Sequence, residues 1–325
     1  MSPTNSPRRP PFGRRALRVV MIATASLLVI AAVSAIGSSA VSASEKAAIM
    51  PYGTTVRLAE GDVNVVRTGG AGPTMVLLSG YGTAAPAIDF APLIRELDEY
   101  DVIVIEGFGY GYSDLDVVDR SIENITSEIH QVLDKLSVST PVILVGHSVG
   151  GLYARYYANQ YPDEVSAIIG IDPMAATTSS LERGTPSVVD GLVNTLGLMR
   201  VASTLVPDLI QPPGTAFTAD ERRRIAAMTN WNYGNPSVSD EWSQIAANST
   251  KANLRPFPSD LPVLEMLSSD SVDTIPGWLA HHEAELATVS SHRLEVLEGT
   301  HYLHWTQSPA IARMIAEFLA TTLDR

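Results

Sequence analysis

Short unbroken apolar runs alternate with segments of helical periodicity along the middle of the chain. The apolar runs are 75–78, 102–105, 142–145 and 167–171, and the helical segments are 92–97, 122–136 and 152–161. Strands that are apolar on both faces are typical of a parallel sheet covered by helices on both sides. Alternation of such strands with helices indicates βαβ units. We therefore predict an α/β protein with a doubly wound, mostly parallel sheet.

The pattern changes at both ends of this central region. Two β-rich runs, 54–58 and 63–68, precede it and predict an antiparallel hairpin. After Asp172 and Pro173 no strong strand appears up to residue 258, although 188–201 and 220–228 have helical character. The strand pattern then resumes at 262–267 and 293–297, with helices expected at 278–290 and 309–323.

This organisation predicts three parts. Residues 46–173 and 259–325 would form the sheet domain, and residues 174–258 a helical cap inserted into it. Residues 1–45 would be a targeting segment outside the fold. We see no internal repeat in the chain.

The targeting segment has the features of a signal peptide or an N-terminal membrane anchor. Five arginines precede the apolar residues 19–36, and the small-residue run that follows ends in Val41-Ser42-Ala43. An 18-residue apolar stretch is long for a cleaved signal and just long enough to span a bilayer, so both alternatives stay open. In either case the arginines stay inside, and we expect the domain to be secreted or anchored on the outer side of the membrane.

Net charge and the absence of cysteine exclude several kinds of binding partner and of chemical site. The formal net charge is −13, and removing the five N-terminal arginines leaves −18 for the rest of the chain. Such a surface disfavours nucleic acid and lipid surfaces bound through charge, so membrane contact is expected only through the N-terminal segment. The chain has no cysteine, which excludes disulfides, thiolate metal sites and a cysteine nucleophile.

A candidate nucleophile lies between an apolar strand and a helix. Gly146-His147-Ser148-Val149-Gly150 fits the pattern G-x-S-x-G, with the strand 141–145 before it and a helix after it. A serine on so tight a turn needs strained backbone angles and small neighbours two residues away, which the glycines provide. We predict that Ser148 is the nucleophile of an acyl-transfer reaction.

A serine hydroxyl needs an adjacent base, and His301 is the best placed of seven histidines. It follows the strand 293–297 and precedes the last helix, so it should lie at the same carboxyl edge of the sheet as Ser148. We expect His147 to face away from the site, His281 and His282 to lie on a helix surface, and His304 to cap a turn or line the pocket. No H-E-x-x-H spacing or other metal-site pattern is present.

The acid that orients the histidine has two candidates. Asp270 follows the strand 262–267, and Asp172 closes the strand 167–171, so either loop could reach the imidazole. We favour Asp270 slightly over Asp172. For the oxyanion, we expect the backbone N–H groups of Val149, after the nucleophile, and of Tyr81, in the glycine-rich loop after the first parallel strand.

Together these segments resemble the α/β-hydrolase superfamily. The resemblance covers nearly all of residues 56–323 except the cap. Besides the segment around Ser148, Glu106-Gly107-Phe108-Gly109-Tyr110-Gly111-Tyr112-Ser113-Asp114 is similar to the loop after the family's second parallel strand, and Gly299-Thr300-His301-Tyr302 to its catalytic-histidine segment. The resemblance implies a two-step acyl-enzyme mechanism without a cofactor.

The chain departs from the family pattern at two places. The usual His-Gly of the oxyanion loop is Ser79-Gly80, which keeps the backbone donor but removes a side chain that often braces the loop. The usual Gly-x-x-Asp reads Ser268-Ser269-Asp270-Ser271, which puts Asp270 one residue out of register. The serine nucleophile also separates the chain from the family's dehalogenases and epoxide hydrolases, which use aspartate there.

We therefore expect a serine hydrolase that cleaves a carboxylic ester of a small, apolar substrate through an acyl-enzyme on Ser148. A peptidase or amidase of the same fold is the nearest alternative, since the cap carries the acidic residues Glu182, Asp190, Asp208 and Asp220. The other alternative is a binding module that kept the fold and lost turnover, because fold alone does not establish function.

Overall fold

The computed structural model describes residues 12–175 and 188–322. Its centre is an eight-stranded sheet in the order β1-β2-β4-β3-β5-β6-β7-β8. The strands are β1 Thr54–Arg57, β2 Asp62–Arg67, β3 Thr74–Leu78, β4 Asp101–Glu106, β5 Val142–His147, β6 Val165–Ile171, β7 Val263–Ser268 and β8 His292–Leu297. Pairing is antiparallel from β1 to β2 and from β2 to β4, and parallel from β4 to β8. The predicted doubly wound α/β fold is confirmed.

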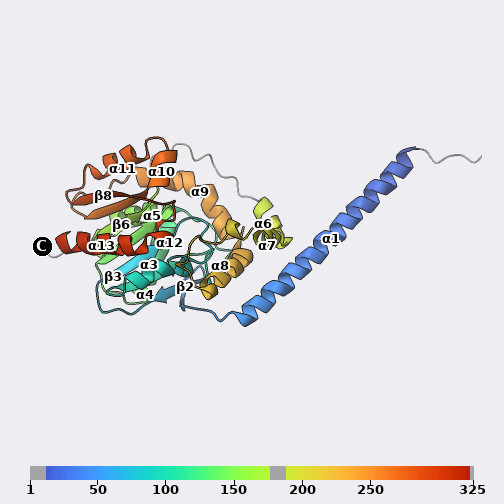
Figure 1. The fold of residues 1–325 in the computed structure, drawn as a ribbon, viewed down its shortest axis with the longest axis horizontal. Helices are drawn as coiled ribbons and strands as arrows, with labels where there is room; N and C mark the ends of the chain where they lie inside the picture. Colours follow the sequence, from blue (N-terminus) through green and yellow to red (C-terminus); the bar gives the residue numbers. More distant parts are fainter. Residues whose placement is uncertain (1–11, 176–187, 323–325) are drawn as a thin grey trace, which may run out of the picture.

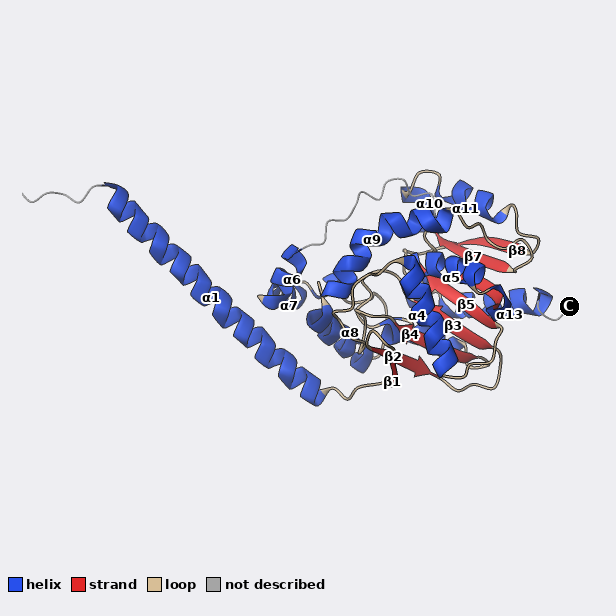
Figure 2. Ribbon diagram, turned by 180° about the vertical axis from the view of Figure 1, so that it is seen from behind, coloured by secondary structure: helices blue, strands red, loops and turns tan. Residues whose placement is uncertain are grey.

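Helices cover both faces of the sheet because the strands are apolar on both sides. In β3, Val76 and Leu78 pack into the cluster with α4 (Ile122–Lys135) and α5 (Val149–Gln160). Met75 and Leu77 pack into the cluster with α3 (Ala91–Glu96) and α13 (Ser308–Thr322). Figure 1 shows α3 and α13 over one face, and Figure 2 shows α4 and α5 over the other. The helices of these layers are α2 Pro86–Asp89, α3 Ala91–Glu96, α4 Ile122–Lys135, α5 Val149–Gln160, α10 Ser269–Thr274, α11 Trp278–Leu286, α12 Leu303–Thr306 and α13 Ser308–Thr322, with a 3₁₀ turn at Pro162–Glu164.

Between β6 and β7 the described chain is helical, in α6 Val188–Thr195, α7 Leu198–Leu205, α8 Ala219–Asn232 and α9 Pro236–Asn253, with a 3₁₀ turn at Pro207–Leu209. Gly197, with a φ of 68°, breaks the single helix expected at 188–201 into α6 and α7. Most of the polar stretch 230–239 belongs to the end of α8 and the start of α9. There Asn235 caps α9 by accepting a hydrogen bond from the N–H of Val238 at 3.0 Å.

The N-terminal helix α1, Phe12–Ala48, projects away from the sheet domain (Figures 1 and 2). Only its C-terminal part lies beside α6 and α8. Residues 16–48 are long and apolar enough to cross a membrane, and their most apolar window is not buried against the protein. This helix is compatible with either a signal sequence or a membrane anchor.

The topology brings the predicted site residues to one edge of the sheet. Tyr81 follows β3, Ser148 follows β5, Asp172 follows β6, Asp270 follows β7 and His301 follows β8. These strands are parallel, so all five residues lie at their carboxyl ends, where open α/β sheets form their sites.

Candidate active site

Ser148 occupies the tight turn between β5 and α5. Its φ of 53° and ψ of −125° lie in a region that residues with a Cβ rarely adopt. A Cβ on Gly146 would lie 2.6 Å from the main chain of Gly150, and one on Gly150 would lie 2.4 Å from the carbonyl oxygen of Leu78. Both positions therefore require glycine, as the sequence pattern predicts, and the turn holds the half-buried Ser148 at the sheet edge.

His301 is held by Asp172. Its Nδ1 lies 2.6 Å from Oδ2 of Asp172, whose side chain is fully buried. The carboxylate also accepts hydrogen bonds from the backbone N–H and hydroxyl of Ser268, both at 2.9 Å, and from the hydroxyl of Ser271 at 2.5 Å. Burial raises the pKa of Asp172, but the hydrogen bonds from His301, Ser271 and Ser268 outweigh burial and keep its pKa below the usual range.

The second candidate acid lies elsewhere. Asp270 has an exposed side chain in the first turn of α10, and its N–H donates to the carbonyl oxygen of Gly299 at 3.2 Å. Its carboxylate has no hydrogen bond to His301 among the described residues. The geometry thus favours Asp172 over Asp270, the residue that the sequence analysis preferred. In this chain the loop after β6, and not the loop after β7, supplies the carboxylate that meets the imidazole.

The backbone ties Ser148 to the loop that carries Asp172. The N–H of Ser148 donates to the carbonyl oxygen of Ile171 at 3.3 Å, and the N–H of Met174 donates to the carbonyl oxygen of Ser148 at 2.9 Å. The Ser148 hydroxyl is not hydrogen-bonded to another described residue, and Nδ1 of His301 is occupied by Asp172. The nitrogen of His301 that remains for proton transfer is Nε2.

The glycine-rich loop after β3 passes directly beside Ser148. A Cβ on Gly80 would lie 3.1 Å from Cβ of Ser148 and 2.9 Å from Nδ1 of His147. The backbone N–H of the next residue, Tyr81, donates no hydrogen bond to another described residue. Val149 lies in the first turn of α5, where a backbone N–H has no partner within the helix. Both N–H groups expected for the oxyanion are therefore open for a ligand.

A buried chain of polar side chains joins this loop to α9. The N–H of Gly82 donates to the hydroxyl of Tyr110 at 3.2 Å, and that hydroxyl donates to Oε2 of Glu241 at 2.7 Å. The hydroxyl of Tyr153 donates to Oε1 of the same carboxylate at 2.6 Å. Glu241 is only 2% exposed. This chain braces the loop that lacks the family's usual histidine, and sequence reasoning missed it.

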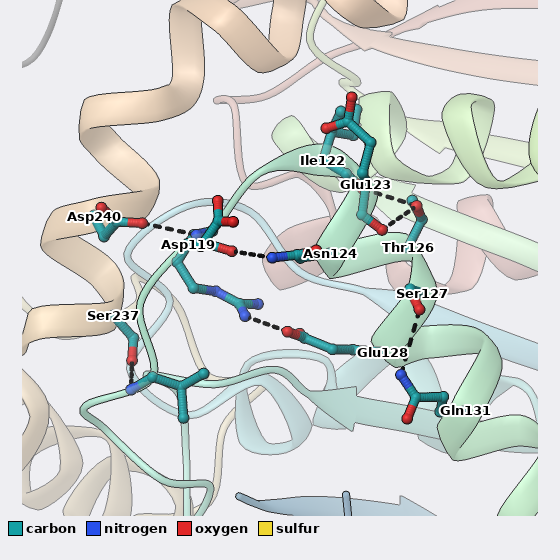
Figure 3. Close-up of polar contacts among 12 residues, drawn as sticks. Asp119, Ile122, Glu123, Asn124, Thr126, Ser127, Glu128, Gln131, Ser237 and Asp240 are labelled. Atoms are coloured by element: carbon teal, nitrogen blue, oxygen red, sulfur yellow. Dashed lines mark hydrogen bonds and ion pairs between the residues drawn. The ribbon is translucent and has the colours of Figure 1, made fainter. Parts of the chain in front are cut away.

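The first turn of α9 is itself fixed to the segment before α4 (Figure 3). Ser237 accepts a hydrogen bond from the N–H of Val117 at 2.9 Å, and Asp240 accepts one from the N–H of Arg120 at 2.7 Å. The guanidinium of Arg120 forms a buried ion pair with Glu128 at 2.6 Å. Glu241 is therefore carried by a helix whose position is set by several neighbouring contacts.

Two histidines differ from expectation. His147 does not face away from the site, because its ring lies 4.7 Å from that of His301 and its Nε2 lies 3.1 Å from the His301 carbonyl oxygen. Burial, with His304 and His301 nearby, depresses the pKa of His147 well below its usual range, so it stays neutral. His304 is also buried, and its Nε2 lies 2.7 Å from Asp89. The His147 ring thus contacts both other imidazoles, with centroids 4.7 Å from that of His301 and 4.6 Å from that of His304.

His282 was expected on the surface but is fully buried, whereas its neighbour His281 is exposed. Nδ1 of His282 lies 2.7 Å from Glu265. With Glu285, these residues could offer three ligand atoms to a metal ion. However, Arg155 forms an ion pair with Glu285 at 2.9 Å, and His282 itself compensates Glu265. Arg155 and His282 thus already pair with the two carboxylates of this cluster.

Two neighbouring pockets lie between the site and the inserted helices. One, of about 320 Å³, is lined by Tyr81, Tyr110 and Trp242 among others. The other, of about 420 Å³, is lined by Tyr302 and Trp305, which follow His301, and by residues of the inserted helices. Gly82 contributes to both pockets, so each one borders the loop beside Ser148.

Comparisons with known proteins agree with this architecture. Residues 73–264 match the family described as alpha/beta hydrolase fold. The uncharacterized protein YbdG of Bacillus subtilis is 28% identical over 94% of this chain and 97% of its own length. Lipase LipV of Mycobacterium tuberculosis is 28% identical over 57% of this chain and 72% of its own length.

Among solved structures, epoxide hydrolase VrEH1 from Vigna radiata superimposes with a TM-score of 0.67, at 18% identity, over 83% of this chain and 98% of its own. This likeness concerns the fold alone. The family match, by contrast, spans more than half of the chain and includes Ser148 and Asp172. The chain belongs to the alpha/beta hydrolase fold family.

Proposed function

We propose that this protein is a serine hydrolase that cleaves carboxylic esters through an acyl-enzyme on Ser148. The observation that carries the proposal is the 2.6 Å contact of His301 with the buried carboxylate of Asp172, at the edge where Ser148 is held in a strained turn. The nucleophile, the orienting acid and the base follow one another along the chain as Ser148, Asp172 and His301, which is the order typical of α/β-hydrolases. The name of LipV, a lipase, supports the same class of reaction.

In the first step, Nε2 of His301 removes the proton from Ser148 while Oγ attacks the ester carbonyl carbon. The N–H groups of Tyr81 and Val149 stabilise the negative oxygen of the tetrahedral intermediate, at about 3–4 kcal/mol per donor. His301 then gives its proton to the leaving alkoxide, and an alcohol departs. Asp172 keeps the imidazole in the required tautomer and stabilises the imidazolium.

In the second step, His301 takes a proton from water, and the resulting hydroxide attacks the acyl-enzyme carbonyl. The proton then returns to Ser148 as the bond to the acyl group breaks, and a carboxylic acid leaves. Each proton and electron pair is accounted for by these groups, so the cycle needs no cofactor.

The serine distinguishes this proposal from epoxide hydrolysis, which shares the fold. That reaction uses an aspartate nucleophile in this family, whereas the position here is Ser148. An amidase with an acidic subsite has weaker support. Of the four acidic residues considered for such a subsite, Asp190 and Asp208 line the two pockets. Asp220 is ion-paired with two arginines of its own helix, and Glu182 lies outside the described residues.

The test is covalent labelling of the full chain in detergent with a fluorophosphonate, read by intact mass, together with turnover of a p-nitrophenyl ester. We expect a single adduct on the wild type that disappears in Ser148→Ala and His301→Ala. The exposed residues Ser290 and His281 serve as matched controls, whose alanine variants should label like the wild type. A folded wild type that takes no label would overturn the proposal.

A further inference from the structure

Aromatic side chains from distant parts of the chain meet around the pocket of about 320 Å³. Tyr81 comes from the loop after β3, Tyr233 from the turn between α8 and α9, and Trp242 from α9. The ring centroids of Tyr81 and Trp242 lie 5.0 Å apart, and the two rings are inclined by 33°. A fourth ring, that of Tyr110, lines the pocket next to Gly82. The π-faces of aromatic rings thus make up much of the wall.

The rest of the wall carries one charged side chain, and its charge is negative. The remaining described residues of the lining are Gly82, Ala84, Gly109, Asp190, Thr229, Asn232, Gly234, Val238 and Ser239. Asp190, in α6, accepts a hydrogen bond from the hydroxyl of Tyr233 at 3.1 Å, so its carboxylate lies beside one of the rings. Lysine, arginine and histidine are absent from the part of the lining that the structure describes.

A second carboxylate lies behind the aromatic wall. Glu241, in α9, accepts hydrogen bonds from the hydroxyls of Tyr110 at 2.7 Å and Tyr153 at 2.6 Å, and both of these donors are neutral. Arg120, which lines the same small cavity as Glu241, forms its ion pair with Glu128 at 2.6 Å. Because Glu241 is only 2% exposed, solvent screens its charge weakly.

The charges of both carboxylates reach Tyr81. Burial raises the pKa of Tyr81, and the charges of Glu241 and Asp190 raise this pKa further. A field that disfavours a tyrosinate at this place favours a cation there. The rings act in the same direction, because the face of an aromatic ring attracts a cation that lies within about 6 Å of its centroid.

We propose that this pocket binds a substituted ammonium group, so that the ester cleaved at Ser148 carries a positive charge. This assignment of the substrate class rests on the proposed function. Tyr81 then contacts the substrate twice, with its N–H at the developing oxyanion and its ring at the ammonium group. The substrate has a charged end, in contrast to the apolar substrate that the sequence led us to expect.

The composition of the wall also selects among ammonium groups. Four rings and one carboxylate line the described part of the pocket. A primary ammonium brings three hydrogen-bond donors that need acceptors, whereas a trimethylammonium group brings none and is recognised by aromatic faces. We therefore assign the pocket to a methylated ammonium group.

Pairs of isosteric esters test the charge directly on the full chain in detergent. Acetylcholine and 3,3-dimethylbutyl acetate differ only in whether nitrogen or carbon carries the methyl groups of the alcohol. The ethyl esters of trimethylglycine and 3,3-dimethylbutanoic acid place the same difference on the acyl side. Each kcat/KM is divided by the rate constant of alkaline hydrolysis, which corrects for intrinsic reactivity.

We expect the corrected kcat/KM of the cationic ester to exceed that of its neutral isostere about tenfold in one of the two pairs. The pair that shows the preference identifies the side of the ester that enters the pocket. Equal values in both pairs, or a preference for the neutral esters, would overturn the proposal.

Trp242 offers a graded test of the aromatic wall. Trp242→Phe keeps a ring with a weaker attraction for cations, and Trp242→Leu removes the ring, so the preference should fall from about tenfold to about threefold and then disappear. Lost packing against Tyr81 would slow both esters of a pair alike and therefore cancels in their ratio. A preference that survives in Trp242→Leu would contradict this assignment.

Asp190→Asn tests the carboxylate without removing a ring. The preference should fall about threefold, because the charge beside the ammonium group is lost. Asp98→Asn is the matched control, since it makes the same change of net charge at an exposed position outside the lining of this pocket. Equal reductions in the two variants would show that only net charge matters and would refute a local site.

Binding measured without turnover separates this proposal from the proposed function. In isothermal titration of the full chain, choline should bind about tenfold more tightly than its neutral isostere 3,3-dimethyl-1-butanol, and the difference should vanish in Trp242→Leu. A wild type that cleaves none of the esters would refute the serine hydrolase, whereas the titration would still decide the pocket. Equal affinities for the two alcohols would exclude the cation site, whatever the turnover.

Discussion

The brace between the oxyanion loop and α9 can be tested by removing one oxygen atom. In Tyr110→Phe, the N–H of Gly82 loses its acceptor and Oε2 of Glu241 loses its donor. Burial, with Glu241 beside it, raises the pKa of Tyr110 well above its usual range. The hydroxyl is therefore protonated throughout the working pH range, and the effect of the substitution should not depend on pH.

The size of the effect follows from the two lost hydrogen bonds. A hydrogen bond to a buried charged group contributes about 1.5–3 kcal/mol and a neutral one about 1 kcal/mol, so we expect Tyr110→Phe to lower the free energy of unfolding by about 3 kcal/mol. Complete loss of an oxyanion donor costs about 10²–10³ in kcat, which sets the upper limit for the catalytic effect. Since the Tyr81 ring still packs against Trp242, with ring centroids 5.0 Å apart, we expect kcat to fall about tenfold, or ~1.4 kcal/mol.

Tyr153→Phe is the matched control. It removes the other donor to the same Glu241 carboxylate but has no contact with Gly82 among the described hydrogen bonds. Urea unfolding should show a destabilisation of about 2 kcal/mol for Tyr153→Phe, which loses one hydrogen bond, about 1 kcal/mol less than for Tyr110→Phe. Steady-state turnover of a p-nitrophenyl ester should show a reduced kcat only for Tyr110→Phe. Equal kcat values in both variants would refute the idea that Tyr110 positions the loop.

Three further outcomes are expected. Asp172→Asn should lower kcat by about 10³–10⁴, while Asp270→Asn, at an exposed position, should stay within about twofold of the wild type in the same assay. Burial lowers the pKa of His282, but its buried glutamate partner outweighs burial and the net pKa is raised. The stability from this pair is therefore full below about pH 6.5 and is lost as pH rises through the raised value, so between about pH 6 and 9 the melting temperature of the wild type should fall more than that of His282→Gln. Gly150→Ala would bring a Cβ within 2.4 Å of a main-chain oxygen and should prevent a cooperative thermal transition, whereas Gly69→Ala meets nothing within 4 Å and should cost only about 1 kcal/mol for its positive φ.

The parts of the fold that the sequence predicts best are those set by local pattern. The buried strands β3 to β6 contain continuous apolar runs, and the turn at Ser148 is marked by glycines that steric contact requires. The sequence pattern did not predict helix α9, because the face of this helix that packs against the protein is partly polar. Ser237, Glu241 and Asn248 are buried there, and pattern analysis assigns such residues to solvent.

The choice of acid and the burial of His282 depend on distant parts of the chain. Asp172 and Asp270 both follow a strand, and only the packing of the loops after β6 and β7 decides which one meets His301. His282 has polar neighbours in the sequence, yet it is buried in contact with Glu265 on β7. Neither relation leaves a local signal, because each partner is chosen by tertiary structure.

The backbone of Ser148 implies a conflict between activity and robustness. Its φ of 53° and ψ of −125° suit glycine, and holding a residue with a side chain there costs on the order of 1–3 kcal/mol. Glycine at this position would relieve that strain and produce a more durable but inactive protein. Selection for stability alone would therefore remove the serine, and its presence in so unfavourable a conformation indicates that the hydroxyl is kept for chemistry.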